Sequence, residues 1–136
     1  MTVKLLDTTF LIHHWGGYPE VKSYLESQPN ETEYITTTLN LKEIAVGRKL
    51  VGRFNPEEIR AQFEWVRTVP ITSTTAWEIA DVEAPLHRDE TTNRDRINAL
   101  AADAVVAGAA IEHEATVVSN NVDDFRALGV PVESYR

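Results

Sequence analysis

Residues Ile97–Ile111 read Ile-Asn-Ala-Leu-Ala-Ala-Asp-Ala-Val-Val-Ala-Gly-Ala-Ala-Ile, and Asp103 is the only charged side chain among them. A run of small and aliphatic residues this long predicts a helix that is buried over most of its circumference, because an amphipathic surface helix would carry a polar face. A carboxylate in such a helix is costly to bury unless it is neutral, paired with a cation or bound to a metal ion. The stretch therefore predicts a helix inside the fold and makes the surroundings of Asp103 the central question.

Short strands and helices alternate along the chain on both sides of this segment. Strands are predicted at residues 3–6, 34–37, 68–71, 115–119 and 130–132. Helices are predicted at residues 19–25, 39–50, 55–66, 73–85 and 122–128, in addition to the buried one. Alternation of this kind requires crossover connections. We therefore predict an α/β fold, a three-layer α/β/α sandwich with a short central parallel sheet.

Two local signals refine this outline. Pro85 is expected to end or bend the helix that starts near residue 73, because proline removes a backbone donor from a helix interior. Residues 88–96 are dense in charge and contain no apolar side chain. They predict an exposed, mobile loop before the buried helix.

Composition bounds the class of protein. With 136 residues, no cysteine and 43% hydrophobic side chains, the chain can bury an ordinary core without disulfides, so we expect a single domain over residues 1–136. Because cysteine is absent and no apolar run reaches the length of a membrane span, we expect a cytoplasmic protein. The net charge of −8 argues against binding nucleic acid over a whole face, although a local basic site is compatible with it.

Acidic residues stand where a parallel sheet gathers ligands. Asp7 and Asp124 each follow a predicted strand, Glu43 lies in a predicted helix beside Ile44, and Asp103 lies in the buried helix. Ligands of such sheets bind beyond the carboxyl ends of the strands. If the four carboxylates cluster there, their mutual repulsion requires cations, and one or two Mg²⁺ or Mn²⁺ ions suit oxygen ligands best. Two such ions, about 3.5–4 Å apart, can activate a water and stabilise the departing oxygen of a phosphodiester.

Ordinary interpretations exist for three of these acids taken singly. Asp7 is suited to cap a helix, and Glu43 is compatible with a solvated helix position. Asp124 could cap a helix or face solvent beside Asp123. Asp103 differs, because its sequence neighbours offer neither a solvated face nor a cation. The histidines lack the His-x-x-x-His spacing of a helical transition-metal site.

Three motifs carry a resemblance to a known family. Leu6-Asp-Thr-Thr-Phe-Leu-Ile12 resembles the opening of a PIN (PilT N-terminus) domain, in which an Asp followed by Thr and then Ser or Thr ends the first strand. Leu41-Lys-Glu-Ile-Ala-Val-Gly47 resembles its central helix motif. Asp103-Ala-Val-Val-Ala-Gly-Ala-Ala110 and the segment from His113 to Phe125 are similar to the C-terminal half of VapC-type toxins. The resemblance covers nearly the whole chain.

This resemblance implies a function and assigns roles to residues. It implies a metal-dependent endoribonuclease, the toxin of a type II toxin–antitoxin pair, which acts as a homodimer and is blocked by a cognate antitoxin. The implied catalytic and metal-binding residues are Asp7, Glu43, Asp103 and Asp124. The implied supporting residues are Thr9, Ser119 and Asn121, with Asp123 as a weaker neighbour of the fourth acid. The family often has glycine and a basic residue shortly before the buried-helix acid, and this chain has Asp95–Asn98 there.

Other interpretations stay open at this point. Arg48, Lys49 and Arg53 follow the Glu43 helix, where they either contact RNA phosphates or complement the helix C-terminus. A phosphatase of the haloacid dehalogenase type would need a second Asp where Thr9 stands. The alternative from a different class is a catalytically silent PIN fold that serves as a binding or assembly module. The presence of all four acids argues against that alternative.

Overall fold

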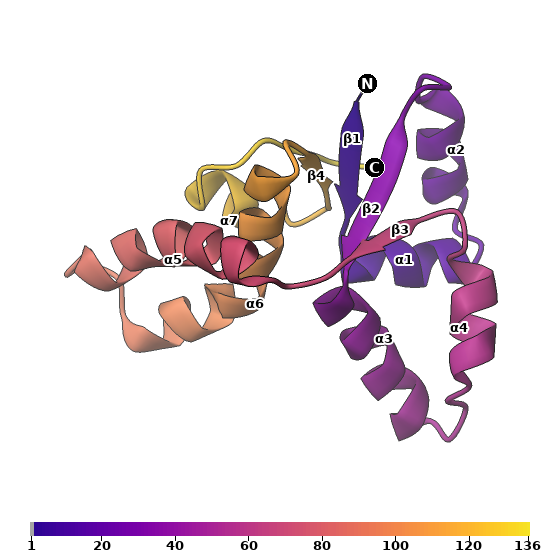
Figure 1. The fold of residues 1–136 in the computed structure, drawn as a ribbon, viewed down its shortest axis with the longest axis horizontal. Helices are drawn as coiled ribbons and strands as arrows, with labels where there is room; N and C mark the ends of the chain where they lie inside the picture. The colour runs from indigo at the N-terminus through magenta and orange to yellow at the C-terminus, as the bar shows by residue number, and fades with distance from the viewer. Residues whose placement is uncertain (1) are drawn as a thin grey trace.

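One parallel sheet forms the centre of the fold, and helices cover both of its faces (Figure 1). The computed structural model describes residues 2–136. The strands are β1 (Val3–Leu6), β2 (Glu33–Thr37), β3 (Arg67–Val69), β4 (Thr116–Val118) and β5 (Val132–Glu133). They lie in the order β3-β2-β1-β4-β5, and every neighbouring pair is parallel. The predicted α/β sandwich is confirmed.

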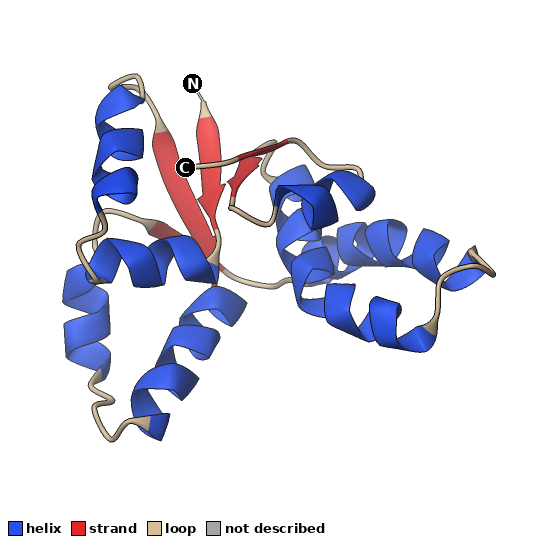
Figure 2. Ribbon diagram, turned by 180° about the vertical axis from the view of Figure 1, so that it is seen from behind, coloured by secondary structure: helices blue, strands red, loops and turns tan. Residues whose placement is uncertain are grey.

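The helices divide into two groups, which lie on opposite sides of the sheet in Figure 2. The first group is α1 (Thr8–Trp15), α2 (Pro19–Ser27), α3 (Thr38–Leu50) and α4 (Pro56–Gln62). The second group is α5 (Ser73–Arg88), α6 (Arg94–Glu112) and α7 (Val122–Ala127). In residues 2–136, no helix combines the length and the apolar character that a bilayer span requires.

The pleat of the central strands separates two hydrophobic cores. Leu5 of β1 and Val117 of β4 belong to the core under α5, α6 and α7. Their neighbours Leu6 and Val118 belong to the core under the first group of helices. All four side chains are fully buried. Because alternate residues of a strand face opposite sides, two apolar residues in sequence are what a sheet covered on both faces requires.

Several boundaries differ from those that the sequence patterns predict. The structure adds α1, which no pattern above predicts. Helix α5 continues to Arg88, so Pro85 does not end it. The predicted loop at residues 88–96 is shorter, because the Asn93 side chain accepts a hydrogen bond from the Arg96 amide at 2.8 Å and caps α6 three residues earlier than expected. Strands β3 and β5 are displaced by one or two residues.

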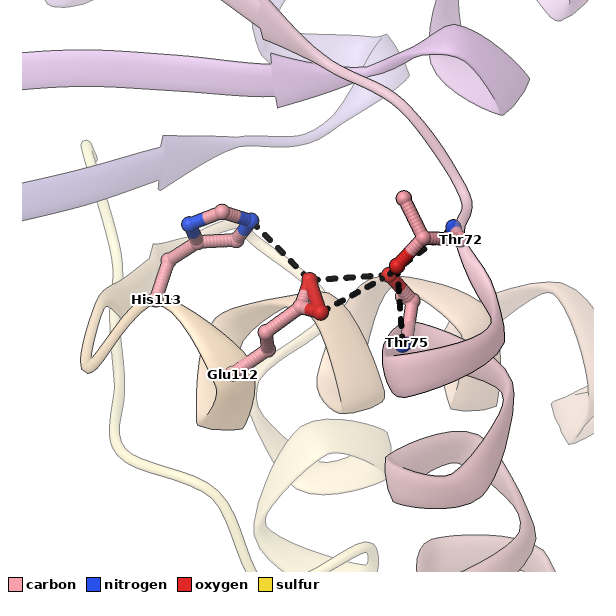
Figure 3. A network of polar contacts seen from close by, with 4 residues as sticks. All are labelled: Thr72, Thr75, Glu112 and His113. Atoms are coloured by element: carbon pink, nitrogen blue, oxygen red, sulfur yellow. Dashed lines mark hydrogen bonds and ion pairs between the residues drawn. The ribbon is translucent and has the colours of Figure 1, made fainter.

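The C-terminal end of α6 is fixed to the start of α5 by a polar network (Figure 3). The buried Thr75 hydroxyl donates to both carboxylate oxygens of Glu112, at 2.8 and 3.0 Å. Nε2 of His113 lies 3.1 Å from Glu112 Oε1. Thr72 and Thr75 form a capping box at the start of α5. The Glu112 carboxylate is therefore surrounded by groups that can donate hydrogen bonds to it.

Candidate functional site

Asp7 lies where the order of the strands reverses, between β1 and β4. The chain runs from β1 to β2 and β3 on one side, whereas β4 and β5 extend the sheet on the other side of β1. A reversal of this kind leaves a crevice at the carboxyl ends of the two central strands. The Asp7 amide donates to the carbonyl of Val118 at 3.4 Å, which joins the two strand ends. The fold therefore contains a crevice at the place where the sequence predicts that ligands bind, beyond the carboxyl ends of the central strands.

A hollow of about 230 Å³ opens at this crevice. It is lined by Asp7, Thr8, Thr9, Asn40, Glu43, Ala102, Asp103, Val106 and Asn121. Three of the four predicted acids and two of the predicted supporting residues thus surround one space. They come from α1, α3 and α6 and from the two strand ends, so segments distant in sequence meet there.

Burial raises the pKa of the Asp7 carboxyl. A hydrogen bond from Ser119 and one from the Phe10 amide, at 2.8 Å, act in the opposite direction, and the charge of Glu43 adds to the rise. The bond from Phe10 makes Asp7 the N-cap of α1. The capping interpretation of Asp7 is therefore correct, and the same carboxylate also lines the hollow.

Among the acids of the hollow, Asp103 has the most strongly raised pKa. Burial raises its pKa to about 6, and the charges of Asp124, Asp7 and Glu43 contribute to the rise. Asn121 opposes it, because its Nδ2 donates to Asp103 Oδ2 at 3.0 Å. Asp103 is half-buried, so the prediction that it has no solvated face is wrong. The buried side of α6 is formed by Ala104 and the small residues that follow, and Asp103 lies at the margin of that side.

Glu43 is held by residues that the sequence analysis does not single out. The Thr8 hydroxyl donates to Glu43 Oε1 at 3.3 Å and accepts from Asn40 Nδ2 at 2.9 Å. Asn40 is buried, and its Oδ1 accepts from the amide and the hydroxyl of Thr37. This is a capping box at the start of α3. The sequence signal was Thr-x-x-Asn directly after a strand, a pattern typical of a helix N-terminus.

Asp124 stands apart from the other acids, because it forms an ion pair. Arg96, in the first turn of α6, donates to Asp124 Oδ1 at 2.8 Å, and this contact lowers the pKa of the carboxyl. Asp124 does not line the hollow, although its charge reaches Asp103. Asp123 is exposed. Ser119 is buried, and its hydroxyl accepts from the Asn121 amide at 2.9 Å.

The predicted basic residues lie beside the hollow or beyond the end of α3. The guanidinium of Arg48 lies 4.4 Å from the ring centroid of Trp15 and donates to Glu58 at 3.1 Å. Lys49 lies over the ring of Phe54. Arg53 is exposed in the loop that follows. Arg48 is therefore the one of the three predicted basic residues whose side chain lies next to residues of α1.

The acids of the hollow carry negative charge without a paired cation. Within residues 2–136, neither Asp7, Glu43 nor Asp103 forms a salt bridge. In the same part of the chain, no three histidine or acidic side chains are already gathered closely enough to hold a metal ion. The charges of Asp7 and Glu43 nevertheless help to raise the pKa of Asp103, because like charges repel.

Comparisons with known proteins identify the family. The sequence profile of the PIN domain matches residues 4–131. The chain belongs to the PIN domain family. No curated protein sequence gives a significant match to it. The resemblance seen in the motifs around Asp7, Glu43 and Asp103 is thereby confirmed.

Solved structures with the same fold include toxin–antitoxin complexes. A chain of a DNA-bound VapBC complex from Salmonella typhimurium superposes on this protein with a TM-score of 0.77 and 18% identity, and the match covers 100% of this chain and 100% of that one. VapBC2 from Rickettsia felis, bound to promoter DNA, gives a TM-score of 0.76 over 98% of both chains at 15% identity. A toxin–antitoxin complex from Klebsiella pneumoniae gives 0.68 over 98% of both chains at 22% identity. At these identities the likeness establishes the PIN fold.

Proposed function

We propose that this PIN domain is a metal-dependent endoribonuclease and the toxin of a type II toxin–antitoxin pair. The observation that carries the proposal is the hollow at the carboxyl ends of β1 and β4. Asp7, Glu43 and Asp103 line it without a salt bridge among the described residues. A structural acid is normally paired. Unpaired carboxylates in this place therefore favour a catalytic role over a purely structural one.

The residues present fit a hard divalent cation. The groups around the hollow are carboxylate, hydroxyl and amide oxygens, which are the ligands that Mg²⁺ and Mn²⁺ prefer. Asn121 occupies Oδ2 of Asp103. We propose Asp7, Glu43 and Asp103 as the ligands of one or two such ions, with Asp124 as a fourth acid that Arg96 now holds. The ions would supply a nucleophilic water at neutral pH and charge neutralisation at the departing oxygen.

The chain's own residues would position these groups. The Phe10 amide fixes one oxygen of Asp7, and Thr8 fixes one oxygen of Glu43. Ser119 is buried under the hollow and holds both Asp7 and the backbone of Asn121. We propose that Thr9, Ser119, Asn121 and the exposed Asp123 support the site in this way. Supporting hydrogen bonds orient ligands and reduce the reorganisation that the reaction needs.

The toxin assignment rests on the fold and its relatives. The structures that share this fold include VapBC complexes and another toxin–antitoxin complex. We propose that this chain likewise pairs with a cognate antitoxin, forms a homodimer and acts on RNA in the cytoplasm as a single domain. An antitoxin that covered the hollow would stop cleavage by excluding the substrate, so the pair would control the amount of active nuclease.

The first experiment asks whether the purified protein cuts RNA. Total cellular RNA and synthetic single-stranded and hairpin RNAs are incubated with Mg²⁺, with Mn²⁺ or with EDTA. Asp7→Asn serves as the test variant, because asparagine can still cap α1 and the fold is preserved. Asp81→Asn is the matched control, since it makes the same change at an exposed acid of α5. We expect metal-dependent cleavage by wild type and Asp81→Asn, and none by Asp7→Asn.

Calorimetric titration with Mn²⁺ provides a reading that does not depend on cleavage. Wild type and Asp81→Asn should bind the ion, and Asp7→Asn should bind it more weakly. If wild type neither cleaves RNA nor binds the ion, the proposal is contradicted, and a catalytically silent binding module is favoured. Equal cleavage by wild type and Asp7→Asn would remove Asp7 from the mechanism.

A further inference from the structure

An apolar groove adjoins the acidic hollow and is not used by the proposed chemistry. It has a volume of about 360 Å³ and lies between α1 and α3. Its lining residues are Ile12, Trp15, Gly16, Glu43, Ile44, Gly47 and Arg48. Ile12 is 50% exposed, whereas Ile44 is buried. Figure 2 shows α1 and α3 diverging from the end of the sheet where the hollow lies.

The groove and the hollow share Glu43, so a single ligand can occupy both. Thr8 and Thr9 of α1 line the hollow, and Ile12 and Trp15 of the same helix line the groove. The two spaces therefore follow one another along α1. A ligand whose charged group enters the hollow would place its next group in the groove.

Arg48 and Trp15 form one wall of the groove. The Arg48 guanidinium lies 4.4 Å from the centroid of the Trp15 ring. Its Nε is buried and has no hydrogen-bond partner within the described residues. Planar guanidinium and aromatic surfaces are what unpaired nucleobases stack on.

The charge around the groove also suits a nucleic acid strand. The chain has 13 basic residues against 21 acidic ones. Four of the basic residues, Lys42, Arg48, Lys49 and Arg53, belong to α3 or to the three residues after it. Arg48 is paired with Glu58, so Lys42, Lys49 and Arg53 are the cations of this group that can attract a polyanion to that place.

We propose that the groove between α1 and α3 binds the base of a nucleotide next to the scissile phosphate of single-stranded RNA. This inference rests on the proposed ribonuclease function and adds a subsite to it. The base stacks on the Trp15 and Arg48 wall and covers Ile12, and the adjoining phosphate lies at the hollow beside Glu43. The groove is thereby a determinant of which RNA is cut.

Gly47 allows the groove to be filled without damage to the fold. A Cβ atom built at Gly47 meets nothing within 4 Å, and the residue lies inside α3, where leucine is a better helix former than glycine. Gly47→Leu should therefore keep or raise the Tm. Val46→Leu is the matched control, because it enlarges the neighbouring exposed side chain, which does not line the groove.

The first test measures KM and kcat on the RNA that wild type cuts fastest. We expect Gly47→Leu to raise KM by about tenfold or more, the cost of losing one stacked base, with kcat nearly unchanged. Val46→Leu should match wild type. An unchanged KM for Gly47→Leu overturns the base subsite and leaves the nuclease intact. If wild type cuts no RNA, the nuclease proposal fails, and the subsite falls with it.

The second test detects base binding without cleavage. Amide spectra of ¹⁵N-labelled protein are recorded with AMP, with UMP and with ribose 5-phosphate, which has no base. We expect the nucleotides to shift the Gly47 amide and the Trp15 indole signals in wild type, with little effect from ribose 5-phosphate. Equal shifts from all three probes overturn the proposal, because they indicate a phosphate contact alone. No shift from any probe also overturns it and leaves the groove to an apolar protein segment.

Discussion

Helix α6 carries two acids with opposite surroundings, Asp103 in its middle and Glu112 at its C-terminal end. Asp103 receives one hydrogen bond, from Asn121, and faces three other acids whose charges help to raise its pKa to about 6. At its end, Glu112 receives two contacts from the Thr75 hydroxyl and lies beside the His113 imidazole (Figure 3). One helix thus contains an acid that the chain surrounds with hydrogen-bond donors, Glu112, and one that it surrounds mainly with other acids, Asp103.

The presence or absence of partners within the chain distinguishes a structural acid from a ligand-binding acid more clearly than the degree of burial does. A buried acid with donors around it lowers its desolvation cost within the fold and ties elements together. An acid without a cation, surrounded by like charges, costs stability, and for Asp103 the hydrogen bond from Asn121 offsets only part of that cost. Such a cost is typical of sites that bind a ligand, because the ligand supplies the missing charge.

Removing the charge of Asp103 is expected to have the largest effect, and that effect is on RNA cleavage. Asp103→Asn keeps an oxygen that can accept from Asn121 but removes a charge from the hollow. We expect a loss of activity on the order of 10³-fold, since a proposed ligand of the catalytic ions is lost. Glu112→Gln makes the same change on the same helix and should stay within about twofold of wild type. Similar losses in both variants would contradict the division of roles.

Sequence patterns predicted the sheet better than the helix boundaries. The five strands were found because apolar pairs such as Leu5 and Leu6 must face two cores. The start of α6 was missed, since the charged residues before Ile97 carry no apolar periodicity and the cap by Asn93 is a local contact. Pro85 lies inside α5, which continues to Arg88, so the proline does not end the helix at that residue.

The candidate site was predicted in part for similar reasons. Spacing after strands pointed to Asp7, and the apolar neighbours of Asp103 marked it as costly. The contacts of Asn40 with Thr8, and of Arg96 with Asp124, join residues that are far apart in sequence. No periodic pattern encodes such a pair. Long-range side-chain partners therefore had to come from the fold itself.

A smaller effect, on stability, is expected at the C-terminal end of α6. Glu112→Ala removes the carboxylate that accepts from the buried Thr75 hydroxyl and leaves only the Thr72 hydroxyl, 3.1 Å away, as its side-chain neighbour. We expect the free energy of unfolding to fall by about 2 kcal/mol, measured by denaturant titration. Thr75→Val with Glu112→Ala removes both partners and should cost less than the sum of the single changes. Additive losses would show that the contact contributes little to the tie between α5 and α6.

The smallest expected effect concerns pH, and it has the opposite sign to that of a stabilising acid. Because the pKa of Asp103 is raised to about 6 in the fold, against about 4 in an unfolded chain, the folded state holds more protons between these values. Stability contributed by the protonated form is therefore complete below pH of about 4 and is lost as the pH rises through about 6.

The measurement compares wild type with Asp103→Asn in EDTA across this pH range. Water reaches part of the Asp103 side chain, so we expect Asp103→Asn to gain about 1 kcal/mol over wild type by pH of about 7, and nothing near pH of about 4. Added Mn²⁺ should stabilise wild type more than the variant, because the ion replaces the missing positive charge. Parallel pH profiles for the two proteins would mean that the hollow is already neutralised by the chain, and the contrast between Asp103 and Glu112 would then disappear.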